Sequence, residues 1–177
     1  MFMAGIPRQD FEEIVRTHSG LVARIAATYE KRPALIEELT QEIFIAVLRA
    51  LPGFRGDASL RTFIARIANN VAIDHVRKST RKPKEVGVEA AYDLPDPKEG
   101  HEALTDMAIK RQRLVEAVRR LDLPLRQVAS LHLEGFSNAE IAEALSLTPN
   151  NVGVRLHRAK AHIAKTLAPM IEEELAS

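Results

Sequence analysis

The stretch SNAEIAEALSLTPNNVGVRLHRAK, residues 137–160, decides the fold of the C-terminal part of this chain. Ser137, followed three residues later by Glu140, is a capping-box pattern, in which each side chain bonds the backbone of the other at a helix start. After a short turn, Thr148 and Pro149 are residue types preferred at the cap and the first position of a second helix. The stretch therefore predicts a helix-turn-helix.

The second helix of this element has an apolar face and a polar, basic face. Its apolar residues recur at steps of four, three and four: Val152, Leu156, Ala159 and Ile163. At about 100° per residue, the opposite face carries Asn150, Asn151, Val154, His157, Arg158, Ala161 and Lys165, with Arg155 at its flank. Amides and guanidiniums can pair with base edges in the major groove, and Arg and Lys neutralise phosphates. The face is therefore typical of DNA binding; the alternatives are a solvated helical hairpin and a calmodulin- or membrane-binding helix.

Length and composition limit what the chain can be. Its 177 residues allow one ordinary domain or two small ones, and 46% hydrophobic with 28% charged residues is typical of a globular protein. The absence of Cys fits the reducing cytosol and excludes disulfides and Cys-bound zinc. No apolar run approaches the roughly 18 residues of a membrane span, and the N-terminus lacks a signal-peptide pattern. We therefore expect a cytoplasmic protein without membrane insertion.

The net charge of +1 does not by itself indicate nucleic-acid binding, but the charges are unevenly distributed. Residues 66–84 hold six Lys or Arg and one acid, and residues 146–169 hold four Lys or Arg and no acid. Acidic residues gather between these two segments, over residues 85–106, and also outside them, as at residues 172–174. The sequence thus predicts two basic patches separated by acidic regions.

Helical periodicity over most of the chain predicts an all-α fold. Apolar residues recur at steps of three and four, as in Leu39, Ile43 and Val47, and no segment shows strand-type alternation. After residue 81 the periodicity fails, and the sequence becomes rich in Pro, Gly and charged residues. We expect two small helical domains, 5–80 and 105–170, joined by a flexible linker, 81–104.

Two segments together resemble the extracytoplasmic-function sigma factors of bacterial RNA polymerase. LDLPLRQVASLHLEGFSNAEIAEALSLTPNNVGVRLHRAKAHI, residues 121–163, is similar to their region 4. EELTQEIFIAVLRALPGFRGDASLRTFIARIANNVAIDHVRK, residues 37–78, is similar to their region 2. Both occur in the family's order. The resemblance implies a protein that directs promoter-specific transcription initiation.

For the N-terminal domain, the resemblance implies binding to core polymerase and to the promoter −10 element. The residues expected to meet the clamp coiled coil of the polymerase are Glu38, Gln41, Glu42, Ile45 and Arg49. The residues expected to contact −10 DNA are Arg55, Gly56, Asp57, Ala58, Arg66, Asn70, Arg77, Lys78 and Arg81. The loop around residues 55–58 would capture a flipped base, at a cost of a few kcal/mol that its pocket must offset. The alternatives are an ordinary helix–helix connection and, for Asn70, a buried polar role.

For the C-terminal domain, the resemblance implies reading of the −35 element. The residues expected to contact it are Asn150, Asn151, Val154, Arg155, His157, Arg158 and Lys160. The surface around residues 125–134 would dock on the polymerase flap. An anti-sigma protein that covers the polymerase-binding faces is a further partner that the family implies.

Three residues depart from the family's pattern, among them Phe63, which stands where Trp is frequent. Ser146 stands where the turn often has Gly, so a residue with a side chain has to adopt the conformation that the turn requires. Gly153 lies inside the recognition helix, where a longer side chain is usual; it costs up to about 1 kcal/mol of helix propensity relative to Ala. Glycine there also removes a side chain that could contact DNA.

Two other classes of protein are the alternatives. A stand-alone helix-turn-helix regulator would dimerise and bind duplex promoter DNA without polymerase. An enzyme is disfavoured because the six His are scattered and no phosphate loop or nucleophile–base motif occurs. We accordingly expect no catalytic residue, metal or cofactor.

Overall fold

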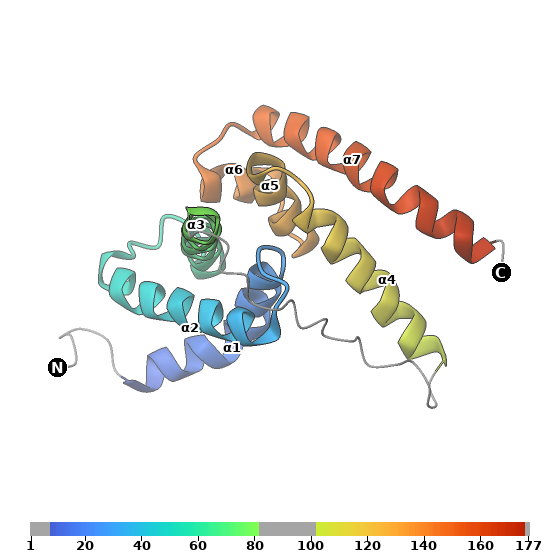
Figure 1. Ribbon diagram of the computed structural model, residues 1–177. Helices are drawn as coiled ribbons and strands as arrows, with labels where there is room; N and C mark the ends of the chain where they lie inside the picture. The colour runs from blue at the N-terminus through green and yellow to red at the C-terminus, as the bar shows by residue number, and fades with distance from the viewer. Residues whose placement is uncertain (1–7, 82–101, 176–177) are drawn as a thin grey trace.

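The computed structural model describes residues 8–81 and 102–175, and all regular elements within those ranges are helical (Figure 1). The N-terminal lobe consists of α1 (Arg8–Ala27), α2 (Pro33–Ala50), a 3-10 turn (Leu51–Gly53) and α3 (Leu60–Arg81). The C-terminal lobe consists of α4 (Glu102–Arg119), α5 (Leu123–Leu133), α6 (Asn138–Leu145) and α7 (Pro149–Leu175). The all-α prediction is confirmed. The expected linker lies largely outside the described residues, and the domain limits stay a prediction.

The N-terminal lobe is built from helices that each bury one stripe. Leu39, Ile43 and Val47, the predicted stripe of α2, are buried against α1 and α3. Ile25 of α1 and Ile64 of α3 are fully buried in the same cluster. The apolar spacing in the sequence is therefore the cause of this packing.

The C-terminal lobe joins a long pair of helices to the helix-turn-helix. α7 packs on α4, α5 and α6, and Figure 1 shows α4 and α7 running alongside each other away from the N-terminal lobe. Val152, Leu156 and Ala159 of α7 are buried, and Ile163 is half-buried, as the spacing predicted. The opposite face of α7 is thereby left to solvent.

The two lobes pack against each other. α3 lies beside α6 (Figure 1) and contacts both α6 and α5. A continuous cluster of buried side chains joins Ile64 of α3 to Leu131 and Ile141 of the C-terminal lobe. Thr28 Oγ1 donates to Ser130 Oγ at 2.9 Å across this contact. The sequence left the placement of the lobes open, and the structure brings them together.

Candidate nucleic-acid interface

The start of the helix-turn-helix is held by the predicted caps. Ser137 N donates to Glu140 Oε2 at 2.8 Å, and Glu140 N donates to Ser137 Oγ at 3.2 Å, which completes the capping box. At the start of α7, Asn151 N donates to Thr148 Oγ1 at 3.2 Å. These side chains satisfy backbone donors that a helix start leaves unpaired.

The turn between α6 and α7 depends on a residue in the left-handed conformation. Ser146 has φ 55° and ψ 45°, a region that favours glycine, as expected from its place in the turn. Leu147 N then bonds Ala142 O at 2.9 Å and closes the helix end. This geometry sets the direction in which α7 leaves the turn.

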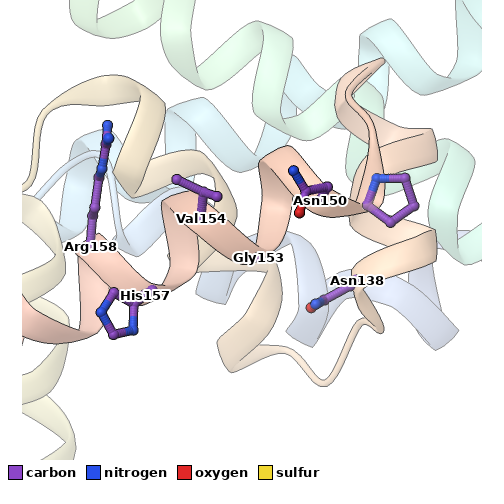
Figure 2. Close-up of a pocket in the computed structure, with 7 residues that line it drawn as sticks. Asn138, Asn150, Gly153, Val154, His157 and Arg158 are labelled. Carbon is purple, nitrogen blue, oxygen red and sulfur yellow. The ribbon is translucent and has the colours of Figure 1, made fainter.

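The predicted −35 residues lie together on the outer face of α7, here called the reading face. Six of them are exposed and Arg155 is half-buried: Asn150, Asn151, Val154, Arg155, His157, Arg158 and Lys160. A hollow of about 490 Å³ lies on this face, lined by Asn138, Pro149, Asn150, Gly153, Val154, His157 and Arg158. Figure 2 shows Asn138 entering it from α6, with the other labelled residues on α7. Asn138, the contribution of α6, was missed because the sequence showed it only as a residue beside the cap.

The predicted −10 loop forms a second hollow of about 330 Å³ on the N-terminal lobe. Its lining includes the whole expected loop set, Arg55, Gly56, Asp57 and Ala58, together with Gly53, Phe54, Phe63, Arg66 and Glu143. Phe54 and Phe63 pack with ring centroids 4.9 Å apart and form an aromatic wall. Gly56 has φ +80°, which a residue with a side chain rarely adopts. The loop therefore borders a hollow with an aromatic wall, and its −10 role stays a prediction.

Two neighbouring asparagines of α3 have opposite surroundings. Asn70 is exposed, as a base-reading role requires, whereas Asn69 is fully buried. Asn69 Oδ1 accepts a hydrogen bond of 2.6 Å from the hydroxyl of Tyr29. The alternative for Asn70 was a buried polar residue. That role is filled by Asn69 instead. Further along α3, Arg77, Lys78 and Arg81 are exposed.

Arg66 contacts the other lobe. Its NH2 donates to Glu143 O of α6 at 3.1 Å, and its buried Nε has no hydrogen-bond partner among the described residues. Glu143 also lines the loop hollow, so the C-terminal lobe stands at the predicted −10 site. In this arrangement one nitrogen of the Arg66 guanidinium is bonded to the other lobe.

Further arginines, missed by the sequence reasoning, connect the lobes. Arg24 Nε donates to both carboxylate oxygens of Glu134, at 3.1 and 2.9 Å, and Arg61 NH2 donates to the backbone oxygen of Glu134. The Arg61 guanidinium also lies 3.8 Å from the centre of the Phe136 ring. On another side, Arg119 Nε donates to Ala27 O at 2.8 Å. Nothing in the local sequence around these arginines distinguishes them from solvated ones.

The outer face of α2 carries the residues expected to bind polymerase. Glu38, Gln41, Glu42, Ile45 and Arg49 are all exposed. Ile45 is 50% exposed and Leu48 is 38% exposed, so the face also offers an apolar contact surface. Leu48 was missed, although an apolar residue outside the buried stripe was a usable signal.

A buried carboxylate fixes the connection between α1 and α2. Glu30 Oε1 accepts hydrogen bonds from the backbone N–H groups of Lys31 and Arg32. Glu30 Oε2 lies 3.0 Å from Arg32 Nη2 and 3.0 Å from His75 Nε2. Burial alone would raise the pKa of Glu30, but the hydrogen bonds from Arg32 and His75 outweigh it and lower that pKa to about 2. Glu30 is therefore a structural anion rather than a proton donor.

In the part of the chain that the structure describes, no His, Asp and Glu residues gather in a group of three that could hold a metal ion. No helix within the same residues is long and apolar enough to cross a membrane.

Two sequence families match the two lobes. Residues 14–82 match Sigma-70 region 2, and residues 111–163 match Sigma-70, region 4. The RNA polymerase sigma-H factor of Pseudomonas aeruginosa is 31% identical over 147 residues, which cover 77% of this chain and 75% of that protein. The ECF RNA polymerase sigma-E factor of Escherichia coli K12 is 30% identical over 148 residues, with the same coverage.

The chain belongs to the extracytoplasmic-function sigma factors. This confirms the expectation of a factor for promoter-specific transcription initiation over that of a stand-alone regulator. The fold of this sigma factor is shared with CnrH in complex with the cytosolic domain of CnrY, with a TM-score of 0.67, 23% identity and coverage of 92% of this chain and 90% of that one. It is also shared with the sigma factor RpoE of Bartonella quintana in complex with the anti-sigma factor NepR, with a TM-score of 0.69, 18% identity and coverage of 90% and 98%.

Proposed function

We propose that this sigma factor reads the −35 element with the reading face of α7 and the −10 element with the 54–59 loop and α3. The observation that carries the proposal is the placement of the −35 residues: chemically suited side chains share one face of a helix-turn-helix helix and are open to solvent. Exposed Asn70, and Arg77, Lys78 and Arg81 at the end of α3, support the −10 role. Basic groups there suit phosphates and an amide suits a base edge.

Core polymerase would bind through the outer face of α2. Ile45 and Leu48 supply exposed apolar area, and Glu42 and Arg49 surround it with charge. An apolar centre with a charged rim suits packing against helices such as the clamp coiled coil. On the C-terminal lobe, exposed His132 and Leu133 at the end of α5 are suited to dock on the flap.

The arrangement of the lobes represents a closed form that must open before −10 DNA is read. Glu143 stands at the loop hollow, and the Arg66 guanidinium is bonded to its backbone. A flipped base and a phosphate would have to replace these contacts. We infer that core polymerase separates the lobes and that an anti-sigma protein, such as the one bound to the sigma factor RpoE in its solved complex, keeps them together.

The sigma factor would act as a binding factor and not as an enzyme. Its relatives are named as sigma factors, and the hollows on the two lobes are lined by groups suited to nucleic-acid contact. We place it in the cytoplasm because its inferred partners, core polymerase and promoter DNA, are found there.

The proposal is tested by run-off transcription with purified core polymerase on a promoter library, with and without the sigma factor. We expect initiation from a subset of promoters that depends on its addition; unchanged initiation would contradict the proposal. On a selected promoter, Asn70→Ala should reduce promoter melting, followed by fluorescence of a base analogue at −10, more than it reduces duplex binding. Ser79→Ala, an exposed change on the same helix, is the control. Equal loss of melting and binding would remove Asn70 from base reading.

A further inference from the structure

Gly153 occupies a helical position at which the folded chain itself gives no reason for glycine. It lies inside α7, where glycine is unfavourable because it gains no side-chain contact and loses much backbone freedom. Positive φ does not require it: among the described glycines, only Gly56 and Gly135 have positive φ. Close packing does not require it either, since an added Cβ would meet nothing within 4 Å among the described residues. The reason for a glycine must therefore lie in something that approaches α7 from outside.

The surroundings of Gly153 describe what could approach. Gly153 lines the hollow of the reading face, and its bare backbone lies between the side chains of Asn150 and His157 along α7 (Figure 2). Val154, next in sequence, is 43% exposed, which places an apolar side chain beside the bare backbone. Amide groups from Asn138 and Asn150 line the same hollow. The site thus combines an apolar part with amides, and the His157 ring and the Arg158 guanidinium line it further along α7. Arg155 and Lys160 lie outside its lining.

This combination matches one feature of duplex DNA. The thymine C5-methyl is the apolar group of the major groove, and the adenine of the same pair presents a donor and an acceptor that an Asn amide can bond. A phosphate could be bound by the Arg158 guanidinium at its end of the hollow, but not at Gly153 itself, because backbone N–H groups inside a helix are already bonded. A bare helix backbone also allows closer approach to a base edge than one that carries a Cβ.

We propose that Gly153 is a specificity-determining residue of the −35 contact, and that the hollow above it receives the methyl group of a thymine against Val154. Asn150 reads the adenine of the same A·T pair or the adjacent one. The inference rests on the proposed −35 role of α7 and adds the base that it selects.

The experiment measures binding by the full chain in complex with core polymerase, on a promoter selected by run-off transcription. Each −35 thymine is replaced in turn by deoxyuridine, which removes only the methyl group. With the wild type, we expect one such replacement to weaken binding about threefold, as loss of one small apolar contact does. The added methyl of Gly153→Ala occupies the same space as the thymine methyl. This variant should therefore bind the thymine and deoxyuridine duplexes equally, and it should bind the thymine duplex less tightly than the wild type does.

Two checks separate this role from a change in folding. Gly153→Ala should raise the thermal midpoint because Ala is the better helix residue. Ala164→Gly makes the reverse exchange at an exposed position of α7 outside the hollow, and it should leave the thymine–deoxyuridine difference unchanged. The inference is overturned if Gly153→Ala shows the same thymine–deoxyuridine difference as the wild type at every −35 thymine. It is also overturned if the selected −35 elements contain no thymine. In both cases the transcription result still supports the proposed function. If the wild type directs no initiation at all, the proposed function itself fails.

Discussion

The two proposed promoter-contact faces of this sigma factor differ in what covers them. The reading face of α7 is exposed apart from half-buried Arg155. At the −10 face the loop residues Arg55, Gly56 and Asp57 are exposed, but Arg66 is bonded to α6 and Glu143 of α6 lines the loop hollow. Helix caps and a left-handed turn set the first face, all within a few residues of one another. Contacts between distant parts of the chain set the second. The −35 face is therefore exposed, whereas part of the −10 face is occupied by the other lobe.

Phosphate oxygens of DNA could replace the backbone oxygens that the arginines near the −10 face now bond. Arg61 and Arg66 donate to backbone oxygens, which are neutral acceptors. Phosphate oxygens are charged acceptors and form stronger hydrogen bonds with guanidinium groups. The buried Nε of Arg66, without a partner among the described residues, adds a cost to the closed form. Promoter DNA can thus favour the open form through the residues that now close it.

The largest expected effect comes from Glu30, which supports the N-terminal lobe where it meets the other lobe. Glu30→Gln removes the anion that holds Arg32 and His75, and we expect the free energy of unfolding to fall by about 2 kcal/mol, as for loss of hydrogen bonds to a charged group. Urea denaturation measures it. Glu13→Gln, at an exposed carboxylate of α1, is the control and should change little.

The effect of Glu30 should depend on pH in a defined direction. Its pKa in the folded protein is about 2, below the ordinary value of 4.5, so its contribution is complete above about pH 4.5 and is lost as the pH falls toward 2. The difference in stability between the wild type and Glu30→Gln should shrink over that range. If the difference in free energy of unfolding between the wild type and Glu30→Gln stays constant between pH 6 and pH 3, the charge of the Glu30 carboxylate is not the source of the stabilisation.

A smaller effect is expected at the open face. Arg158→Ala should weaken binding of −35 duplex DNA by polymerase-bound sigma factor about tenfold, and it should reduce the slope of log K against log salt by about 0.9 if the contact is to a phosphate. Arg16→Ala removes the same charge from an exposed site of the N-terminal lobe and serves as the control. A salt slope equal to that of the wild type, with weaker binding, would assign Arg158 to a base edge instead.

The smallest effect concerns the covered face. The ion pair of Arg24 with Glu134 is partly exposed, so reversing either charge should change the ratio of open to closed forms only about two- to fivefold. Because the chain has no Cys, fluorophores can be placed at Ser79→Cys and Ala164→Cys, one on each lobe, and energy transfer compared. Arg24→Glu and Glu134→Arg should each lower energy transfer, and the double variant should restore it. Without restoration, this ion pair does not hold the lobes together.

Short-range signals predicted much of the fold and of the reading face. The capping box of Ser137 and Glu140 and the cap at Thr148 follow from residues three positions apart, whereas the conformation of Ser146 was expected from the family resemblance. The difference between Asn69 and Asn70 did not follow, because adjacent helical residues lie only about 100° apart and the position of Tyr29 decides which amide is buried. Such a distinction requires the neighbouring helix to be in place.

The sequence by itself determined the helices, their buried stripes, the helix-turn-helix and the family, because periodicity, caps and turns are local physical effects. Only the tertiary structure decided that Arg24 meets Glu134, 110 residues away, and that Arg66 meets Glu143, 77 residues away. A guanidinium has the same chemistry whether it faces phosphate, carboxylate or a backbone oxygen. Its partner is set by the packing of the two lobes against each other, which no local pattern contains.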